Sequence, residues 1–389
     1  MDALQVFDFD REIDRSNTGS LKWDVKEGQL PMWVADMDFE VAPAIKEALR
    51  NRVEHGVFGY TITPDEWYDA YISWWQRRHH FTMEKEWLIF STGVVPIISS
   101  VVRKITTPAE NVIVITPAYN IFFNSIFNNG RNIVECILPY NRENCSYNID
   151  FADLEKKCSD PQSTLLILCN PHNPTGKIWD ADTLARIGEI CKRHHVTVLS
   201  DEIHCDITLP GTEYTPFASV SETCREISIT CIAPTKAFNI AGLQTAAVCV
   251  PNEELRHKVW RGLNTDEVAE GNVFSYEAAI AAFRQGEPWL KALLEYLAEN
   301  RTYAEAYIKE NIPKLRTVHG EATYLLWIDC DSLQTDSETL TRRIEEKTGL
   351  ILCDGCEYRG DGIHFLRMNL ACPRSRLQDG LERLKKAVQ

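Results

Sequence analysis

Between residues 87 and 250, short apolar runs alternate with longer amphipathic segments, and this pattern constrains the fold most strongly. Residues 112–115 and 165–168 are apolar at every position rather than at alternate ones. Such runs are typical of strands covered on both faces, as in a parallel sheet. Because helical segments separate them, they indicate βαβ units. The sequence therefore predicts an α/β fold with a mostly parallel sheet flanked by helices.

The expected strands cover residues 87–91, 111–116, 163–169, 196–200, 227–233 and 245–250, and the expected helical segments between them include 94–105, 122–127 and 182–194. After about residue 275 the pattern changes. Two helical stretches are followed by alternating strands and helices up to a last helix near residues 377–387. We expect a large domain over residues 46–280 and a smaller α+β domain formed by residues 1–45 and 281–389.

The composition narrows the classes of function. The net charge of −15 disfavours binding to nucleic acid or to an anionic membrane surface. Residues 1–5 lack the pattern of an export signal, and no apolar run approaches the ~20 residues of a membrane span. With 13 cysteines, an odd number, we expect reduced thiols and a cytoplasmic protein. We predict no metal site, and we expect the pairs His79-His80 and His194-His195 on the surface.

Four polar clusters follow predicted strands, where open α/β sheets bind their ligands. They are S-T-G-V-V-P at 91–96, N-P-H-N-P-T-G at 170–176, S-D-E-I-H at 200–204 and P-T-K-A-F-N-I-A-G at 234–242. Taken singly, three of them have an ordinary structural explanation: a strand-to-helix turn, a helix cap or ion pair, and a surface lysine. The second, with two prolines around an amide, already favours a functional loop.

Taken together, the clusters match the needs of pyridoxal phosphate. Backbone N–H groups of residues 93–95 at a helix start suit a phosphate. The prolines hold Asn173 rigidly, and Asp201 at a buried strand end needs a cation or a donor. Lys236 lies among apolar neighbours, which lowers the pKa of a lysine and frees its amine as a nucleophile. In pyridoxal-phosphate enzymes a lysine forms the Schiff base, and an acid keeps the ring nitrogen charged.

The motifs N-P-H-N-P-T-G, S-D-E-I-H and P-T-K-A-F-N-I-A-G-L resemble those of fold-type-I pyridoxal-phosphate enzymes of the class I/II aminotransferase superfamily. More narrowly, the chain resembles the cystathionine β-lyase/cystalysin-like C–S lyases. The segments M-W-V-A-D-M-D-F at 32–39, F-G-Y at 58–60 and H-F-L-R-M-N-L-A at 364–371 extend the resemblance over essentially the whole chain.

The resemblance implies roles for individual residues. Lys236 is the Schiff-base lysine, and Asp201 is the partner of the pyridine nitrogen. Asn173 contacts the ring hydroxyl and the substrate carboxylate, Tyr119 stacks on the ring, and Arg367 binds the substrate α-carboxylate. The residue pattern supports this last role independently, because Arg367 alternates with the apolar residues of a predicted strand and so faces away from their layer.

The resemblance also implies a phosphate site and a homodimer. Its expected phosphate ligands are Gly93, Val94, Val95 and Thr235, and Tyr60 is expected to reach the phosphate site of the partner subunit. Ala35 is expected to contact the substrate carboxylate through its backbone. Tyr119 and Tyr60 are both candidates for orienting or protonating the leaving sulfur, and the sequence does not choose between them.

Three positions depart from typical aminotransferases. His204 stands where a tyrosine usually donates to the ring hydroxyl, Ala233 stands where a serine often binds phosphate, and Gln244 stands where an arginine often does so. These departures agree with the lyase branch and imply weaker anchoring of the phosphate.

The sequence therefore predicts β-elimination of L-cystathionine or related cysteine S-conjugates to pyruvate, ammonia and a thiol. One alternative is an aminotransferase that acts on an L-amino acid and a 2-oxo acid, because it would use the same residues. The other is a non-catalytic regulatory protein on the same fold. The presence of both Lys236 and Asp201, and the lack of an added basic segment, argue against the regulatory protein.

Overall fold

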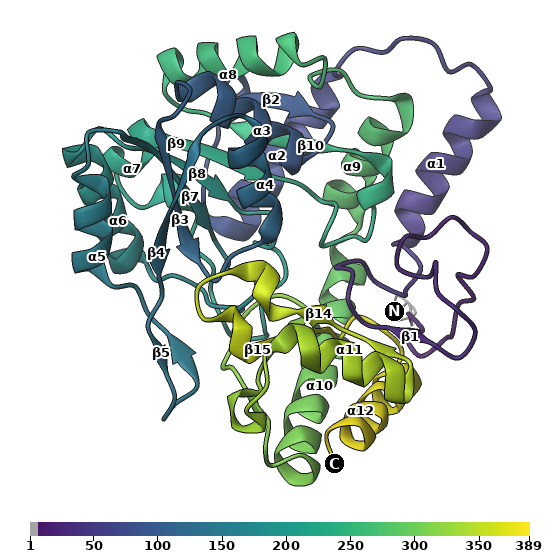
Figure 1. The fold of residues 1–389 in the computed structure, drawn as a ribbon. Helices are drawn as coiled ribbons and strands as arrows, with labels where there is room; N and C mark the ends of the chain where they lie inside the picture. The colour runs from purple at the N-terminus through teal and green to yellow at the C-terminus, as the bar shows by residue number, and fades with distance from the viewer. Residues whose placement is uncertain (1–6) are drawn as a thin grey trace.

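The computed structural model describes residues 7–389. A seven-stranded sheet with helices around it forms the upper part of the molecule in Figure 1, and a four-stranded sheet with the C-terminal helices lies below it. This arrangement confirms the predicted α/β fold with a second α+β part. The domain boundaries near residues 45 and 280 stay a proposal.

The large sheet has the order β2-β10-β9-β8-β7-β3-β4, and only β10 runs antiparallel to its neighbours. Its strands are β2 (Leu88–Ser91), β3 (Asn111–Thr116), β4 (Asn132–Ile137), β7 (Ser163–Cys169), β8 (Thr197–Asp201), β9 (Ser228–Ile232) and β10 (Ala246–Cys249). The order reverses direction between β3, which leads to β4, and β7, which leads to β8. Because β7, β8 and β9 are parallel neighbours, their carboxyl ends meet at one edge of the sheet. That edge carries the predicted polar clusters.

Both faces of this sheet are covered, as its apolar runs predict. In β3, Val112 and Val114 pack in one apolar cluster, whereas Ile113 and Ile115 pack in another on the opposite face. The helices of this part are α1 (Pro43–His55), α2 (Asp65–His79), α3 (Val94–Ile105), α4 (Asn120–Asn128), α5 (Phe151–Cys158), α6 (Ala181–Arg193), α7 (Glu222–Ile227), α8 (Glu253–Thr265) and α9 (Val273–Gln285). Helices α3, α4 and α8 cover one face, and α5, α6 and α7 cover the other.

The smaller sheet is antiparallel, in the order β11-β12-β15-β14. Its strands are β11 (Arg316–Thr317), β12 (Leu325–Asp329), β14 (Cys353–Asp354) and β15 (Phe365–Asn369), and its helices are α10 (Glu287–Asn311), α11 (Ser337–Thr348) and α12 (Arg374–Val388). In addition, β1 (Leu30–Pro31) pairs with β13 (Leu350–Ile351), and β5 (Tyr140–Asn141) pairs with β6 (Ser146–Tyr147). Leu366 and Met368 enter the apolar core of this part, so the predicted alternation that turns Arg367 the other way is confirmed.

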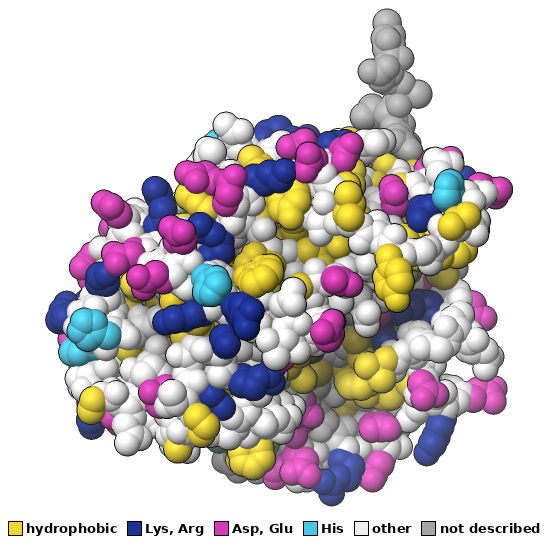
Figure 2. Space-filling view, turned by 90° about the horizontal axis from the view of Figure 1, so that it is seen from above, with side chains coloured by type: hydrophobic (Ala, Val, Ile, Leu, Met, Phe, Trp, Pro, Cys, Tyr) yellow, Lys and Arg dark blue, Asp and Glu magenta, His cyan; other side chains and the backbone are white. Residues whose placement is uncertain are grey.

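The charged surface and the state of the cysteines agree with what the composition predicts. Figure 2 shows Asp and Glu side chains spread among Lys and Arg over one face. Within residues 7–389, no helix combines the length and the apolar character that crossing a bilayer requires. All 13 cysteines carry free thiols.

The expectation that His79 lies on the surface is wrong. Its side chain is 5% exposed, and its Nε2 lies 3.0 Å from Oδ1 of Asp206. The neighbouring His80 is exposed, in the left-handed conformation that ends α2. The two histidines do point apart, and this is the reason why only one of them reaches solvent.

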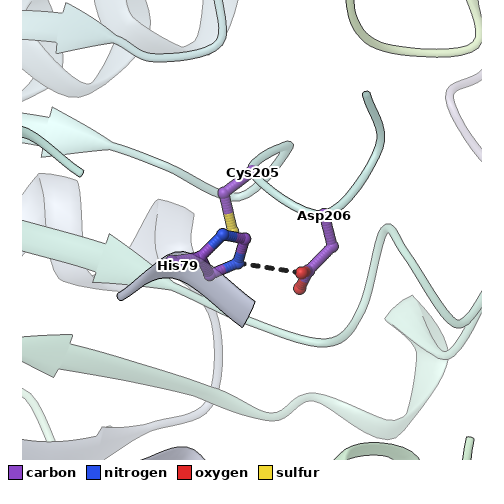
Figure 3. Close-up of side chains that lie close together, drawn as sticks. All are labelled: His79, Cys205 and Asp206. Atoms are coloured by element: carbon purple, nitrogen blue, oxygen red, sulfur yellow. Dashed lines mark hydrogen bonds and ion pairs between the residues drawn. The ribbon is translucent and has the colours of Figure 1, made fainter. Parts of the chain in front are cut away.

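His79, Cys205 and Asp206 lie close together, and residues of these types can bind metals (Figure 3). However, the Asp206 carboxylate already accepts hydrogen bonds from Nε1 of Trp74 at 3.1 Å and from Nε of Arg78 at 2.8 Å. The Arg78 guanidinium supplies the positive charge that a metal ion would bring. This cluster therefore joins α2 to the loop after β8 as a structural ion pair.

Candidate active site

The four predicted polar clusters converge on one cavity of about 210 Å³ at the carboxyl ends of the strands of the large sheet. Ten of the predicted site residues line it: Ala35, Gly93, Val94, Val95, Tyr119, Asn173, Asp201, His204, Thr235 and Lys236. Arg367 lies beside the cavity and bonds to one of its lining residues. Tyr60 is fully exposed and is not among the lining residues.

Lys236 is held at the cavity by the backbone of a distant segment. Its Nζ donates a hydrogen bond of 2.7 Å to the carbonyl oxygen of Ala35. Removal from water, and then the positive charge of Arg367, lower the pKa of Lys236 to about 8. More of the amine is therefore unprotonated near neutral pH than in an ordinary lysine, and this is the form that attacks an aldehyde.

Asp201, the last residue of β8, is 5% exposed. Burial raises the pKa of its carboxyl to about 6. Its oxygen accepts a hydrogen bond from the backbone N–H of Ile203 at 3.2 Å, but no Lys or Arg side chain of residues 7–389 lies within ion-pair distance. A cation that entered the cavity would stabilise a buried carboxylate in this position.

His204 is the second buried polar group at the cavity that has an unused hydrogen-bonding position. Burial, followed by the charges of Lys236 and Arg367, lowers the pKa of its ring to about 3, so the ring is neutral. Its Nδ1 has no hydrogen-bond partner in the part of the chain that the structure describes. A ligand with a hydroxyl or another polar group at this point would satisfy it.

The start of α3 supplies an anion site on the same cavity. The helix begins at Val94, Gly93 is its N-cap, and no side chain of the described residues caps it. Its first N–H groups therefore remain free at the positive end of a 12-residue helix. Thr235 and Gln244 line the same cavity. A phosphate fits this place, and the orphaned Asp201 and His204 fit a cationic aromatic ring, so the residues present fit pyridoxal phosphate.

Arg367 is 4% exposed and has no carboxylate partner among the described residues. Its Nη1 donates to Oδ1 of Asn173 at 3.2 Å, and its Nη2 donates to the carbonyl oxygen of Trp33 at 2.9 Å. Because Asn173 turns its oxygen toward the guanidinium, its two N–H groups are left for a ligand. A buried guanidinium bonded only to neutral acceptors is suited to an incoming carboxylate.

Three residues that sequence reasoning missed hold the segment that carries Ala35. Asn369 donates from Nδ2 to the carbonyl oxygens of Val34 at 2.6 Å and Asp36 at 2.7 Å. Asn239 accepts from the N–H of Met37 at 3.0 Å and donates to Phe39. Tyr324 donates to the oxygen of Ala35 at 2.9 Å. Asn239 lies three residues after Lys236, and Asn369 lies two residues after Arg367, within the motifs quoted above. This closeness in sequence could have identified them as site residues.

Tyr119 and Thr235 complete the cavity wall. Tyr119 precedes α4, and burial raises the pKa of its phenol, whereas the charge of Arg367 acts in the opposite direction. The phenol is therefore protonated at neutral pH and can donate a hydrogen bond. Thr235 directly precedes Lys236 and is 8% exposed.

Comparison with known proteins agrees with this geometry. A family described as aminotransferase class I and II matches residues 28–384. Cystathionine beta-lyase PatB of Bacillus subtilis is 42% identical over 98% of this chain and 99% of its own length. Cystalysin from Treponema denticola, whose crystal structure contains pyridoxal 5'-phosphate, has a TM-score of 0.95 and 34% identity over 98% of each chain. The pyridoxal-phosphate-bound C–S lyase of Staphylococcus hominis has a TM-score of 0.92 and 32% identity over 99% of each chain.

Proposed function

Because the chain belongs to the aminotransferase class I and II family and is a pyridoxal-phosphate enzyme of the carbon–sulfur lyase type, we propose that it acts on L-cystathionine and related cysteine S-conjugates. The reaction consumes one water, breaks the Cβ–S bond and releases pyruvate, ammonia and a thiol. One observation carries the proposal: the same cavity holds a lysine with a pKa lowered to about 8 and a carboxyl with a pKa raised to about 6. Burial is the main cause of both shifts, and ionisable groups shifted in this way inside one cavity mark a functional site.

The residues that would hold the cofactor follow from their places in the cavity. Asp201 would pair with the ring nitrogen, and Asn173 and His204 would bond the polar substituents of the ring. Tyr119 would lie against the ring. The N–H groups of residues 93–95, with Thr235, would bind the phosphate. When bound, pyridoxal phosphate supplies a conjugated cationic ring that accepts the electron pair left at Cα.

The chain itself binds the substrate and moves its protons. Arg367 and Asn173 would hold the α-carboxylate, which fixes the orientation of the Cα–H bond. Lys236 would then remove the Cα proton, since its lowered pKa leaves a basic amine near neutral pH. As the Cβ–S bond breaks, the protonated phenol of Tyr119, or Tyr60 of the partner subunit, would orient or protonate the departing sulfur.

We also propose a homodimer in which Tyr60 enters the neighbouring site. Tyr60 is fully exposed, and it stands with Val57, Phe58 and Ile62 in a stretch that is apolar and largely in solvent. An exposed apolar stretch of this kind is typical of an interface. We further propose that the protein is cytoplasmic. The free thiols of all 13 cysteines support this location.

The test is incubation of the holoenzyme with L-cystathionine, with and without 2-oxoglutarate. Lyase activity gives pyruvate and ammonia without the keto acid, in equal amounts. An aminotransferase gives glutamate, and only when the keto acid is present. Failure to form either product from a panel of cysteine S-conjugates would contradict the proposal.

A further inference from the structure

The donors of Arg367 are unevenly used. A guanidinium has five N–H groups, one on Nε and two on each Nη. In this site Nη2 has two acceptors, the carbonyl oxygen of Trp33 at 2.9 Å and Sγ of Cys353 at 3.1 Å. Nη1 has one acceptor, Oδ1 of Asn173, whereas the buried Nε has none among the described residues.

Cys353 is placed beside Arg367 by the small sheet. It belongs to β14 and is the direct cross-strand partner of Arg367 on β15. Its Sγ also lies 3.3 Å from the carbonyl oxygen of Trp33, to which the thiol can donate. With an exposure of 8% the thiol is buried, so the thiol, the carbonyl and Nη2 form a closed triangle.

Two-point binding of a carboxylate needs more free N–H groups than Arg367 has in the unliganded site. Two-point binding uses two neighbouring N–H groups, either one from each Nη or one from Nε and one from Nη2. Both arrangements require Nη2. Because Nη2 already has two acceptors, one of its hydrogen bonds must be given up when the carboxylate binds.

Of the two hydrogen bonds of Nη2, the one to the sulfur of Cys353 is the weaker and is the easier to break. A neutral thiol is a weak acceptor, whereas a backbone oxygen is a strong one. The carbonyl of Trp33 is also fixed by the neighbouring segment, in which Asn369 bonds Val34 and Asp36. The hydrogen bond to Trp33 therefore stays, and the bond to the sulfur is exchanged.

We propose that Cys353 is a positioning residue that occupies Nη2 of Arg367 in the free enzyme and yields it to the carboxylate of the substrate. The proposal rests on the proposed function only in assigning the α-carboxylate to Arg367. It makes the acceptor strength at position 353 a determinant of substrate affinity. A stronger acceptor there competes with the carboxylate, and a side chain without an acceptor does not.

The experiment compares Cys353→Ala, Cys353→Ser and Cys353→Asp in the holoenzyme. L-Alanine, which has a carboxylate but no leaving group at Cβ, is titrated against each variant, and the visible absorbance of the bound cofactor reports binding. Ethylamine, which has the amine but no carboxylate, is the matched ligand. Cys356→Ser is the control variant, because Sγ of Cys356 lies 3.2 Å from Oγ of Ser337 and does not bond Arg367.

We expect the affinity for L-alanine to fall in the order Ala, Cys, Ser, Asp at position 353. The aspartate should weaken binding at least about tenfold and the serine about threefold, since charged and neutral oxygen acceptors compete more strongly than sulfur. Ethylamine binding and the Cys356→Ser variant should stay within about twofold of wild type. With L-cystathionine, the aspartate should raise KM and leave kcat nearly unchanged.

Other outcomes would overturn the proposal. If Cys353→Ala weakens L-alanine binding as much as Cys353→Asp does, the thiol only supports Arg367 and does not compete with the ligand. Equal losses for L-alanine and ethylamine would mean a general disturbance of the site. Should the aspartate variant fail to fold, the alanine and serine variants still decide the order. None of these titrations requires C–S cleavage, so they are independent of whether the proposed reaction occurs.

Discussion

Nζ of Lys236 and the carbonyl oxygen of Ala35 are joined by a 2.7 Å hydrogen bond between residues 201 positions apart in the chain. The same oxygen accepts a second hydrogen bond from Tyr324. The segment that carries Ala35 is further fixed by Asn239 and Asn369. The N-terminal part of the chain therefore sets the position of the amine on which the chemistry depends.

Replacing this amine should stop the reaction. We expect Lys236→Ala to lower kcat for L-cystathionine by at least about 10³-fold, because both the attachment of the cofactor and the proton transfer at Cα are lost. Pyruvate release measures activity, and the visible absorbance of the purified protein measures attachment of the cofactor. Wild-type turnover by this variant would remove Lys236 from the mechanism.

Replacing the buried acid tests its pairing with the cofactor. Asp201→Asn keeps the shape but removes the charge that would hold the ring nitrogen protonated. We expect kcat to fall about 10²-fold or more, with the cofactor still bound through the phosphate site and Lys236. The spectrum of the bound cofactor should change with the substitution. An unchanged spectrum together with unchanged turnover would assign Asp201 a purely structural role.

The carboxylate site depends on the planar fork of Arg367. Arg367→Lys retains the charge but loses two-point binding, and a lysine cannot bond Asn173 and the ligand in the same way. We expect KM for L-cystathionine to rise about 10- to 100-fold while kcat falls much less. Steady-state kinetics separates the two parameters. A loss confined to kcat would place the arginine elsewhere in the mechanism.

Most of the sheet and the cavity could be predicted because local signals and burial agree. The strands β3 and β7 have the predicted bounds, and α3 begins at the predicted residue. The glycine and prolines around Asn173 and the apolar neighbours of Lys236 act locally, so the sequence carries their effect. These are the positions where local chemistry and the tertiary fold impose the same requirement.

Other features depend on contacts between distant residues. The antiparallel direction of β10 is set by the path of the chain between β9 and β10, and its apolar residues do not encode it. The burial of His79 depends on Asp206, 127 residues later in the chain. Likewise, Cys353 touches Arg367 only because β14 pairs with β15. Periodicity within one segment contains no information about such pairings.

The buried Glu202 predicts how stability changes with pH in the cofactor-free protein. Its carboxylate accepts hydrogen bonds from Ser200 at 2.7 Å and from the N–H of Phe217 at 2.9 Å, yet burial raises its pKa from 4.5 to about 7. Because the folded state binds this proton more tightly than the unfolded state, the stabilisation is complete below pH 4.5. It is lost as the pH rises through 7.

Glu202→Gln removes that titration. We therefore expect the Tm of the variant minus the Tm of wild type to increase between pH 4.5 and pH 8 and to be constant below that range. Thermal unfolding at a series of pH values measures this difference. Glu226→Gln is the control, because Glu226 is exposed and pairs with Lys192. A difference that is the same at every pH would mean that folding leaves the pKa of Glu202 unshifted.

The proposed exchange of Tyr60 between subunits can be tested by mixing two inactive proteins. In a dimer of Tyr60→Ala subunits both sites lack the tyrosine. In a dimer of Lys236→Ala subunits both sites lack the amine. In a mixed dimer, the subunit with Lys236→Ala lends an intact Tyr60 to a neighbour that still has Lys236. One of the two sites then contains every residue it needs.

Unfolding the two variants together and refolding them at equal concentration should restore about one quarter of the wild-type activity. Half of the dimers are then mixed, and each of these has one complete site. Each variant refolded alone is the control, and size-exclusion chromatography confirms that both form dimers. If each subunit uses its own Tyr60, the mixed dimer has one site without the lysine and one without the tyrosine. The mixture would then have no more activity than the mean of the two variants, and Tyr60 would have to act within its own chain.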